Sequence, residues 1–168
     1  MARLLLVASG FWLGLLTASW VMATLSFRSV DRVLGPEARP EMAARLAGLP
    51  EAERRVVLRH LASEINRGMF RTWAVAQLVL GALALGAAWR GAGPPRLLIG
   101  AAFLLVLIQL AVLTPAIATT GRSIDFVPRP LPADLGRRFG LLHAAYVGAD
   151  FLKAILVALA AWTVARRP

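Results

Sequence analysis

Four side chains that can titrate or form hydrogen bonds recur in the last apolar stretch of the chain. His143, Tyr146, Asp150 and Lys153 stand at positions i, i+3, i+7 and i+10, so a helix would carry them on one face. A charge at the bilayer centre costs about 2.5–3.5 kcal/mol, and two charges three residues apart can pair and offset part of that cost. The spacing therefore predicts a polar site inside a membrane.

Two interpretations of the Asp150–Lys153 pair are open. In the first, the pair is neutralised and locks a helix bundle. In the second, it responds to protons or ions, because a desolvated lysine can lose its proton whereas an arginine cannot. Lys153 is the single lysine of the chain. Gln77 and Gln109 lie in other apolar segments, and either could form a hydrogen bond across the bundle to this polar face.

The elements that position these residues are four apolar segments, each long enough to cross a hydrocarbon core of about 30 Å. Hydrophobic residues make up 58% of the 168-residue chain. We therefore predict an all-α integral membrane protein, a four-helix bundle forming one domain over residues 1–168. The first segment resembles a signal peptide, but its length favours a retained helix. The predicted spans are residues 4–27, 70–89, 97–119 and 139–165.

A polar, amphipathic segment, residues 28–69, separates the first two spans. Val57, Leu61, Ile65 and Met69 recur every four residues and predict a helix with one apolar stripe. This helix either continues into the second span or lies on the membrane surface with a bend near Gly68. It would act as a solvated lid or as a docking surface for a partner. Residues 41–46 predict a shorter helix before it.

Glycine and proline punctuate the other segments. The Gly91-Ala92-Gly93-Pro94-Pro95 connection predicts that the second and third spans are antiparallel neighbours. Thr114-Pro115 predicts a kink in the third span. Gly10 and Gly14 form a Gly-x-x-x-Gly pair, which predicts close helix packing, either within the bundle or in a dimer.

The net charge of +10 raises the possibility of nucleic-acid binding, but the arginines flank the apolar segments, as membrane helix ends require. We predict no nucleic-acid partner; the lipid bilayer is the expected environment. Five arginines lie on the side of the two termini and thirteen on the side of the first and third loops. The positive-inside rule then places those loops in the cytoplasm and both termini outside the cell membrane.

The residues offer little for cofactor or metal chemistry. The chain has no cysteine. Of its two histidines, His60 and His143, the first is predicted to lie roughly 15 Å outside the membrane if its helix continues straight, which disfavours a bis-histidine haem. It contains no zinc motif, phosphate loop, nucleophile elbow or catalytic carboxylate pair. We predict no cofactor, no metal and no enzymatic activity.

Short motifs along nearly the whole chain are similar to those of a known family. They are Ser26-Phe27-Arg28-Ser29 after the first span, the Ala62 to Phe70 approach to the second, Leu113-Thr114-Pro115-Ala116-Ile117 in the third, and Arg138 to Tyr146 at the entry of the last. In these motifs the chain resembles the transmembrane protein 205-like family of small four-span membrane proteins. The resemblance implies an α-helical membrane bundle. It does not point to a specific activity.

Two hypotheses for function follow. The first is a non-enzymatic accessory or scaffolding component that associates with other membrane subunits or with itself. The second is a small oligomeric transporter or ion-coupled permease. In the second hypothesis, Asp150 and Lys153 form the switch, and Gln77, Gln109, His143 and Tyr146 line the path.

Overall fold

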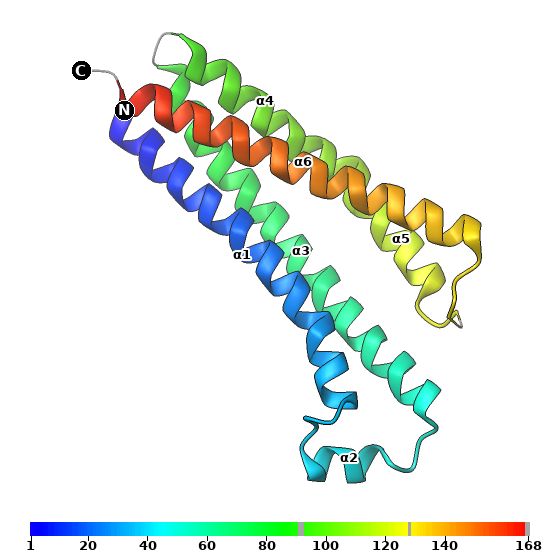
Figure 1. Cartoon of the computed structure of the whole chain (residues 1–168). Coiled ribbons are helices and arrows are strands. Elements are labelled where there is room, and N and C mark those ends of the chain that lie inside the picture. Colours follow the sequence, from blue (N-terminus) through cyan, green and yellow to red (C-terminus); the bar gives the residue numbers. More distant parts are fainter. Residues whose placement is uncertain (91–92, 128, 167–168) are drawn as a thin grey trace.

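The computed structural model describes residues 1–90, 93–127 and 129–166, and every regular element in these ranges is a helix. Four helical segments are long and apolar enough to cross a membrane: Ala2–Leu34, Glu51–Trp89, Pro94–Ile124 and Ala133–Ala165. The N-terminus and the end of the last helix lie close together at one end of the bundle (Figure 1). The predicted all-α four-helix membrane bundle is confirmed. Gly91, Ala92, Pro128 and Arg167 lie outside the described residues.

The amphipathic segment of the first loop is part of the second membrane helix. Helix α1 (Ala2–Leu34) runs seven residues past the predicted end of the first span, and α3 (Glu51–Trp89) is a single helix without a break at Gly68. The segment 28–69 is therefore mostly a helical continuation of the two spans. Between α1 and α3 lies the short helix α2 (Pro40–Leu46), as predicted. At about 1.5 Å per residue, the 39 residues of α3 extend about 58 Å, nearly twice the hydrocarbon thickness.

The third membrane helix changes its winding in the middle. Helix α4 (Pro94–Ile108) passes into a π-helical turn, η1 (Gln109–Leu113), and then into α5 (Thr114–Ile124). In this turn the Thr114 N–H donates to the Gln109 carbonyl, five residues earlier. Pro115 follows directly and has no N–H to continue the α-helical pattern, so a wider turn is a suitable arrangement before it. The irregularity predicted at Thr114-Pro115 is thus a π turn.

The half of the bundle that holds both chain termini is packed with apolar side chains. We call this half, from the level of Lys153 to the termini, the terminal half. Here α1, α3, α4 and α6 (Ala133–Ala165) bury a continuous core in which several side chains are completely enclosed. The core residues include Leu5, Ala8, Trp12, Ala84, Ala88, Ile99, Ala102, Val106, Val157, Ala160 and Val164.

One glycine sets how closely the helices approach in this half. A Cβ atom on Gly81 of α3 would lie 2.6 Å from Cδ2 of Phe103 on α4 and 3.0 Å from Cη2 of Trp12 on α1. Real Cβ atoms do not approach ring carbons so closely, so only glycine fits between these two rings. Gly81 therefore allows α1, α3 and α4 to meet at one level.

At the opposite end α1 and α3 diverge from α5 and α6, although side chains of α3 still contact Tyr146 and Asp125. Figure 1 shows α1 and α3 continuing toward α2, while α5 and the start of α6 diverge from them. We call this part, from the level of Lys153 toward α2, the loop half. Its buried side chains are fewer and include polar ones, namely Asn66, Thr120 and Tyr146.

Candidate functional site

Lys153 lies at the junction of the two halves and is completely buried. Its ammonium group donates to three oxygens: Asp150 Oδ1 at 2.8 Å, Gln77 Oε1 at 2.5 Å, and Gln109 Oε1. An ammonium has three N–H donors, so every donor has an acceptor. The glutamines predicted as partners from two other helices therefore both contact the polar face of α6. We call Gln77, Gln109, Asp150 and Lys153 the polar cluster.

Asp150 is satisfied on both of its carboxylate oxygens. Oδ1 accepts from Lys153 and from Gln109 Nε2 at 3.0 Å, and Oδ2 accepts from the Trp20 indole N–H at 3.4 Å. A second indole, that of Trp12, donates to Gln77 Oε1 at 3.4 Å. Every membrane helix thus contributes a hydrogen-bonding side chain to the polar cluster. The two tryptophan donors were not predicted, because a tryptophan in an apolar segment can equally well be a packing residue or a residue at the membrane interface.

Gln109, the first residue of the π turn, hydrogen-bonds to two successive turns of α6. Besides its contacts with Lys153 and Asp150, Gln109 Nε2 donates to the backbone carbonyl of Tyr146 at 3.0 Å. That carbonyl lies one turn before Asp150 in α6. Gln109 begins η1, so the local widening of the helix occurs at the residue that reaches across the bundle. A π turn at a polar residue in the membrane interior is a feature often found at functional sites.

The distribution of charges along the helices places the polar cluster near mid-membrane. Gln109 is thirteen residues from Arg96 and thirteen from Arg122, the nearest charges on either side in its helix. Lys153 is thirteen residues from Arg166 and fifteen from Arg138. At about 1.5 Å per residue, each of these intervals is close to 20 Å, somewhat more than half a hydrocarbon core. The cluster is therefore enclosed in protein at the depth where a lone charge is most costly.

The predicted polar face of α6 is divided by the separation of the helices. Tyr146 is 7% exposed, and its ring meets Phe70 of α3 edge to face, with centroids 5.6 Å apart. His143, one turn earlier, is exposed and stacks on Phe139 of its own helix with centroids 6.2 Å apart. Helical spacing put His143 on the correct face, but the bundle has already opened at its level. His143 therefore takes no part in the polar cluster.

A second group of polar side chains lies at the loop end and was missed. Asp125, just past α5, accepts from Arg67 Nη2 at 2.6 Å and lies 3.1 Å from His60 Nδ1. Arg67 Nη2 also contacts Glu64 Oε1 at 2.6 Å. His60, Glu64 and Arg67 stand at i, i+4 and i+7 on α3, a spacing that could have revealed the face, although nothing in the sequence pointed to Asp125 as its partner.

This second group also contains the side chains most suited to hold a metal ion. Ligand atoms of His60, Glu64 and Asp125 lie within 4.8 Å of one another. The Arg67 guanidinium, however, already contacts both carboxylates and supplies the positive charge that they need. The group is best described as an ion-pair network that joins α3 to the end of α5. His60 and His143 are engaged with separate partners, Asp125 and Phe139, and do not face each other as haem ligands.

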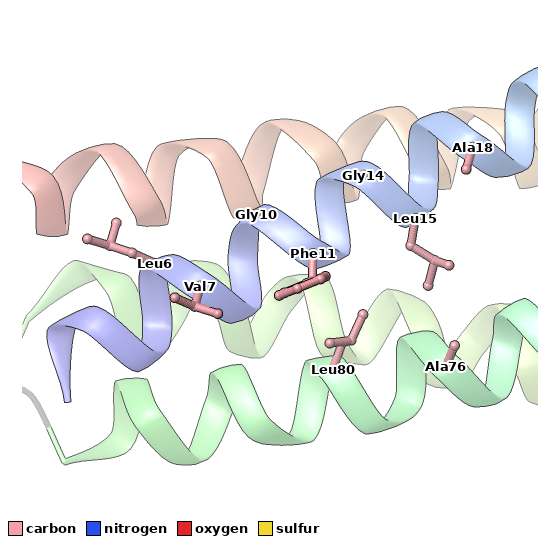
Figure 2. A pocket seen from close by; sticks show the side chains of 9 residues that line it. All are labelled: Leu6, Val7, Gly10, Phe11, Gly14, Leu15, Ala18, Ala76 and Leu80. Carbon is pink, nitrogen blue, oxygen red and sulfur yellow. The ribbon is translucent and has the colours of Figure 1, made fainter.

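Gly10 and Gly14 do not serve packing within the chain. Among the described residues, nothing lies within 4 Å of a Cβ atom placed at either position, so the structure gives no intrachain contact that requires a glycine here. Both glycines line an apolar groove of about 670 Å³ on the outer surface between α1 and α3 (Figure 2). The other lining residues are Leu6, Val7, Phe11, Leu15, Ala18, Ala76 and Leu80. The dimer interpretation of the pair stays a prediction.

Comparison with known proteins adds no family to this description. No family model, curated protein or solved structure was found to match this chain. Fold and site therefore rest on the geometry above.

Proposed function

We propose that this integral membrane protein is a non-enzymatic accessory or scaffolding component of a larger membrane complex. The observation that carries the proposal is an apolar stripe on the loop end of α3. Val57, Leu61 and Ile65 lie on one side of this helix, and each is more than half exposed. We call these three residues the α3 stripe. An exposed apolar row of this kind is typical of a helix that packs against a partner.

The α3 stripe lies outside the expected hydrocarbon region. Cationic side chains surround it, and the nearest of them, Arg54, Arg55 and Arg59, stand within the same turns of the helix. Leu61 precedes Gln77 by sixteen residues, which corresponds to about 24 Å along a helix, well beyond the 15 Å half-thickness of the core. Lipid tails therefore would not cover this stripe as they cover the outward-facing residues of the spans.

The polar cluster supports a structural role for the bundle interior. All three ammonium donors of Lys153 and both carboxylate oxygens of Asp150 have partners inside the protein. Removing one partner of such a pair leaves a buried charge unpaired and costs about 3–5 kcal/mol. The polar cluster would hold α3, the π turn and α6 in a fixed register. A fixed register suits a scaffold whose α3 stripe must be held in one position for a partner.

Co-purification from native membranes tests the proposal. Tagged wild-type protein should recover stoichiometric partners, and the triple variant Val57→Ser, Leu61→Ser, Ile65→Ser should lose at least tenfold of that recovery. The chain offers a matched control in Val75→Ser, Val79→Ser, Leu83→Ser. This row has the same spacing and a similar exposure on the same helix, but lies in the span. The proposal would be contradicted if the wild-type protein is recovered without partners. It would also be contradicted if the α3-stripe variant recovers as much partner as the wild type.

A small oligomeric transporter or ion-coupled permease is the second candidate. The observation in its favour is a titratable Asp–Lys pair at mid-membrane, packed against a π turn that could rearrange. Asp150→Asn and Lys153→Met in proteoliposomes separate the two candidates. Loss of substrate or ion flux at unchanged melting temperature would favour transport. Unchanged flux with a lowered melting temperature would eliminate it.

Two further expectations belong to the proposal. Membership in the transmembrane protein 205-like family would be consistent with four spans and a non-enzymatic role. The orientation expected from the arginines places α2 and the loop half on the cytoplasmic side, where the α3 stripe would meet a cytoplasmic or peripheral partner. A reporter fused after Pro168 should be active outside the cytoplasm, and activity inside would reverse this orientation.

A further inference from the structure

We propose that water enters the bundle from the loop side, reaches the polar cluster, and stops there. The ligand of this interior is thus water, admitted from one face of the membrane only. This inference is independent of the proposed scaffolding role, because it depends on the bundle interior and not on the α3 stripe.

The first evidence is a set of buried polar atoms that lack partners in the loop half. Among the described residues, nothing hydrogen-bonds to Asn66 Oδ1 or Trp73 Nε1, and Thr114 Oγ1 lies beside the hydroxyl of Tyr146 without a hydrogen bond of good geometry. An unsatisfied buried group costs about 1–3 kcal/mol, and buried waters commonly satisfy such groups. A threonine hydroxyl can turn to a backbone carbonyl of its own helix, whereas an indole N–H cannot. Asn66 and Trp73 are therefore the residues that most clearly require a buried water as a partner.

The second evidence is the direction in which these groups face. Asn66, Phe70, Trp73 and Gln77 are spaced at i, i+4, i+7 and i+11, so they follow one face of α3. Phe70 contacts Tyr146, and Gln77 accepts from Lys153, so this face is turned toward α6. The indole N–H and the amide oxygen without partners thus lie on the face that leads from the loop end to the polar cluster, about 16 Å in all.

The third evidence is a gradient of exposure along α6. His143 is exposed, Tyr146 is 7% exposed, Asp150 is 3% exposed and Lys153 is fully enclosed. The gradient follows the divergence of α1 from α6 toward the loop end seen in Figure 1, while Trp20 of α1 still contacts Asp150 of α6. Access to Asp150 therefore improves toward the loop side.

Beyond Lys153 the interior closes. The residues that continue the same faces, Ala84 and Ala88 on α3 and Val157 and Ala160 on α6, are buried and apolar. Ser9 Oγ is the one partnerless buried side-chain oxygen or nitrogen that the described residues contribute to this half. A water file needs two to four polar partners for each molecule, and this half does not supply them.

Single cysteines test one-sided access, and the chain suits the method because it contains no cysteine of its own. Thr114→Cys probes the loop half about 7.5 Å from the level of Gln109, and Val157→Cys probes the terminal half about 6 Å from Lys153. Val112→Cys, an outward-facing position that is 58% exposed, reports on lipid. Each variant is reconstituted in liposomes with known orientation and treated with a charged, membrane-impermeant methanethiosulfonate from either side.

Thr114→Cys should react at least tenfold faster than Val157→Cys and Val112→Cys, and only with reagent on the loop side. Asn66→Cys should behave like Thr114→Cys, and decides the outcome if Thr114→Cys does not give a monodisperse protein. Equal rates at Thr114, Asn66 and Val157 would overturn the inference, as would reaction from the side of the termini. Reaction of Val157→Cys from the loop side would show a path through the whole bundle and would also overturn it.

Discussion

The two halves of this bundle are built from the same four helices but solve the problem of burial differently. In the terminal half, small and aliphatic side chains interlock around Gly81, and several are completely enclosed. In the loop half, the helices separate and the interior carries Asn66, Thr120 and Tyr146. The polar cluster lies where one arrangement gives way to the other. Close packing therefore fixes the terminal half, whereas in the loop half the ion pairs of Asp125 with His60 and Arg67 join α3 to the end of α5.

The largest expected effect comes from breaking the polar cluster at this junction. Lys153→Met leaves Asp150 charged and without its main partner, so the free energy of unfolding should fall by about 3–5 kcal/mol. The double variant Asp150→Asn, Lys153→Met removes both charges and should lose clearly less. Unfolding in detergent with increasing dodecyl sulfate measures both. Equal losses for the single and double variants would show that charge pairing does not hold the junction.

Gly81→Ala should come next, and it acts on the terminal half alone. The added methyl would overlap the rings of Phe103 and Trp12, and such overpacking costs about 1–3 kcal/mol. Gly10→Ala is the matched control, because its methyl would have no neighbour within 4 Å in the described part of the chain and an alanine favours a helix. The same unfolding assay compares the two. A Gly81→Ala protein as stable as Gly10→Ala would mean that the close contact of α1, α3 and α4 is not required.

A smaller effect is expected at the open end. Asp125→Asn weakens the network with His60 and Arg67 that joins α3 to the end of α5, and should cost about 1–2 kcal/mol. The change should appear mainly as faster amide hydrogen exchange in α5, with the terminal half unaffected. Faster exchange throughout the bundle would instead indicate that the two halves unfold as one unit.

The smallest effect is expected at His143. Its side chain is exposed and, among the residues that the structure describes, stacks on Phe139 of its own helix, so His143→Ala should change the free energy of unfolding by no more than about 0.5 kcal/mol. Tyr146→Ala, one turn deeper, should lose several times as much because Tyr146 is buried against Phe70. A larger loss at His143 than at Tyr146 would mean that the helices still pack closely at the level of His143.

The sequence predicts the four spans and the contact of Gln77 and Gln109 with the polar face of α6, because apolar length and helical spacing are local properties. It does not predict which helices approach one another. For that reason Gly81 was missed while Gly10 and Gly14 were selected, and Trp12, Trp20 and Asp125 were not recognised as partners. His143 shows the same limit, since spacing gives its face but not the level at which neighbouring helices diverge.

The continuity of α3 has a mechanical consequence. One unbroken rod carries the α3 stripe at its outer end and Gln77 at mid-membrane, where Gln77 Oε1 accepts from Lys153. The rod has no hinge at Gly68, so a partner that tilts the outer end turns the whole rod about its tight contact at Gly81. Gln77 stands one helical turn from that pivot and Leu61 stands twenty residues from it. A displacement of the outer end of α3 is therefore several-fold smaller at Gln77. The contact of Gln77 with the Lys153 ammonium is kept while the outer end moves.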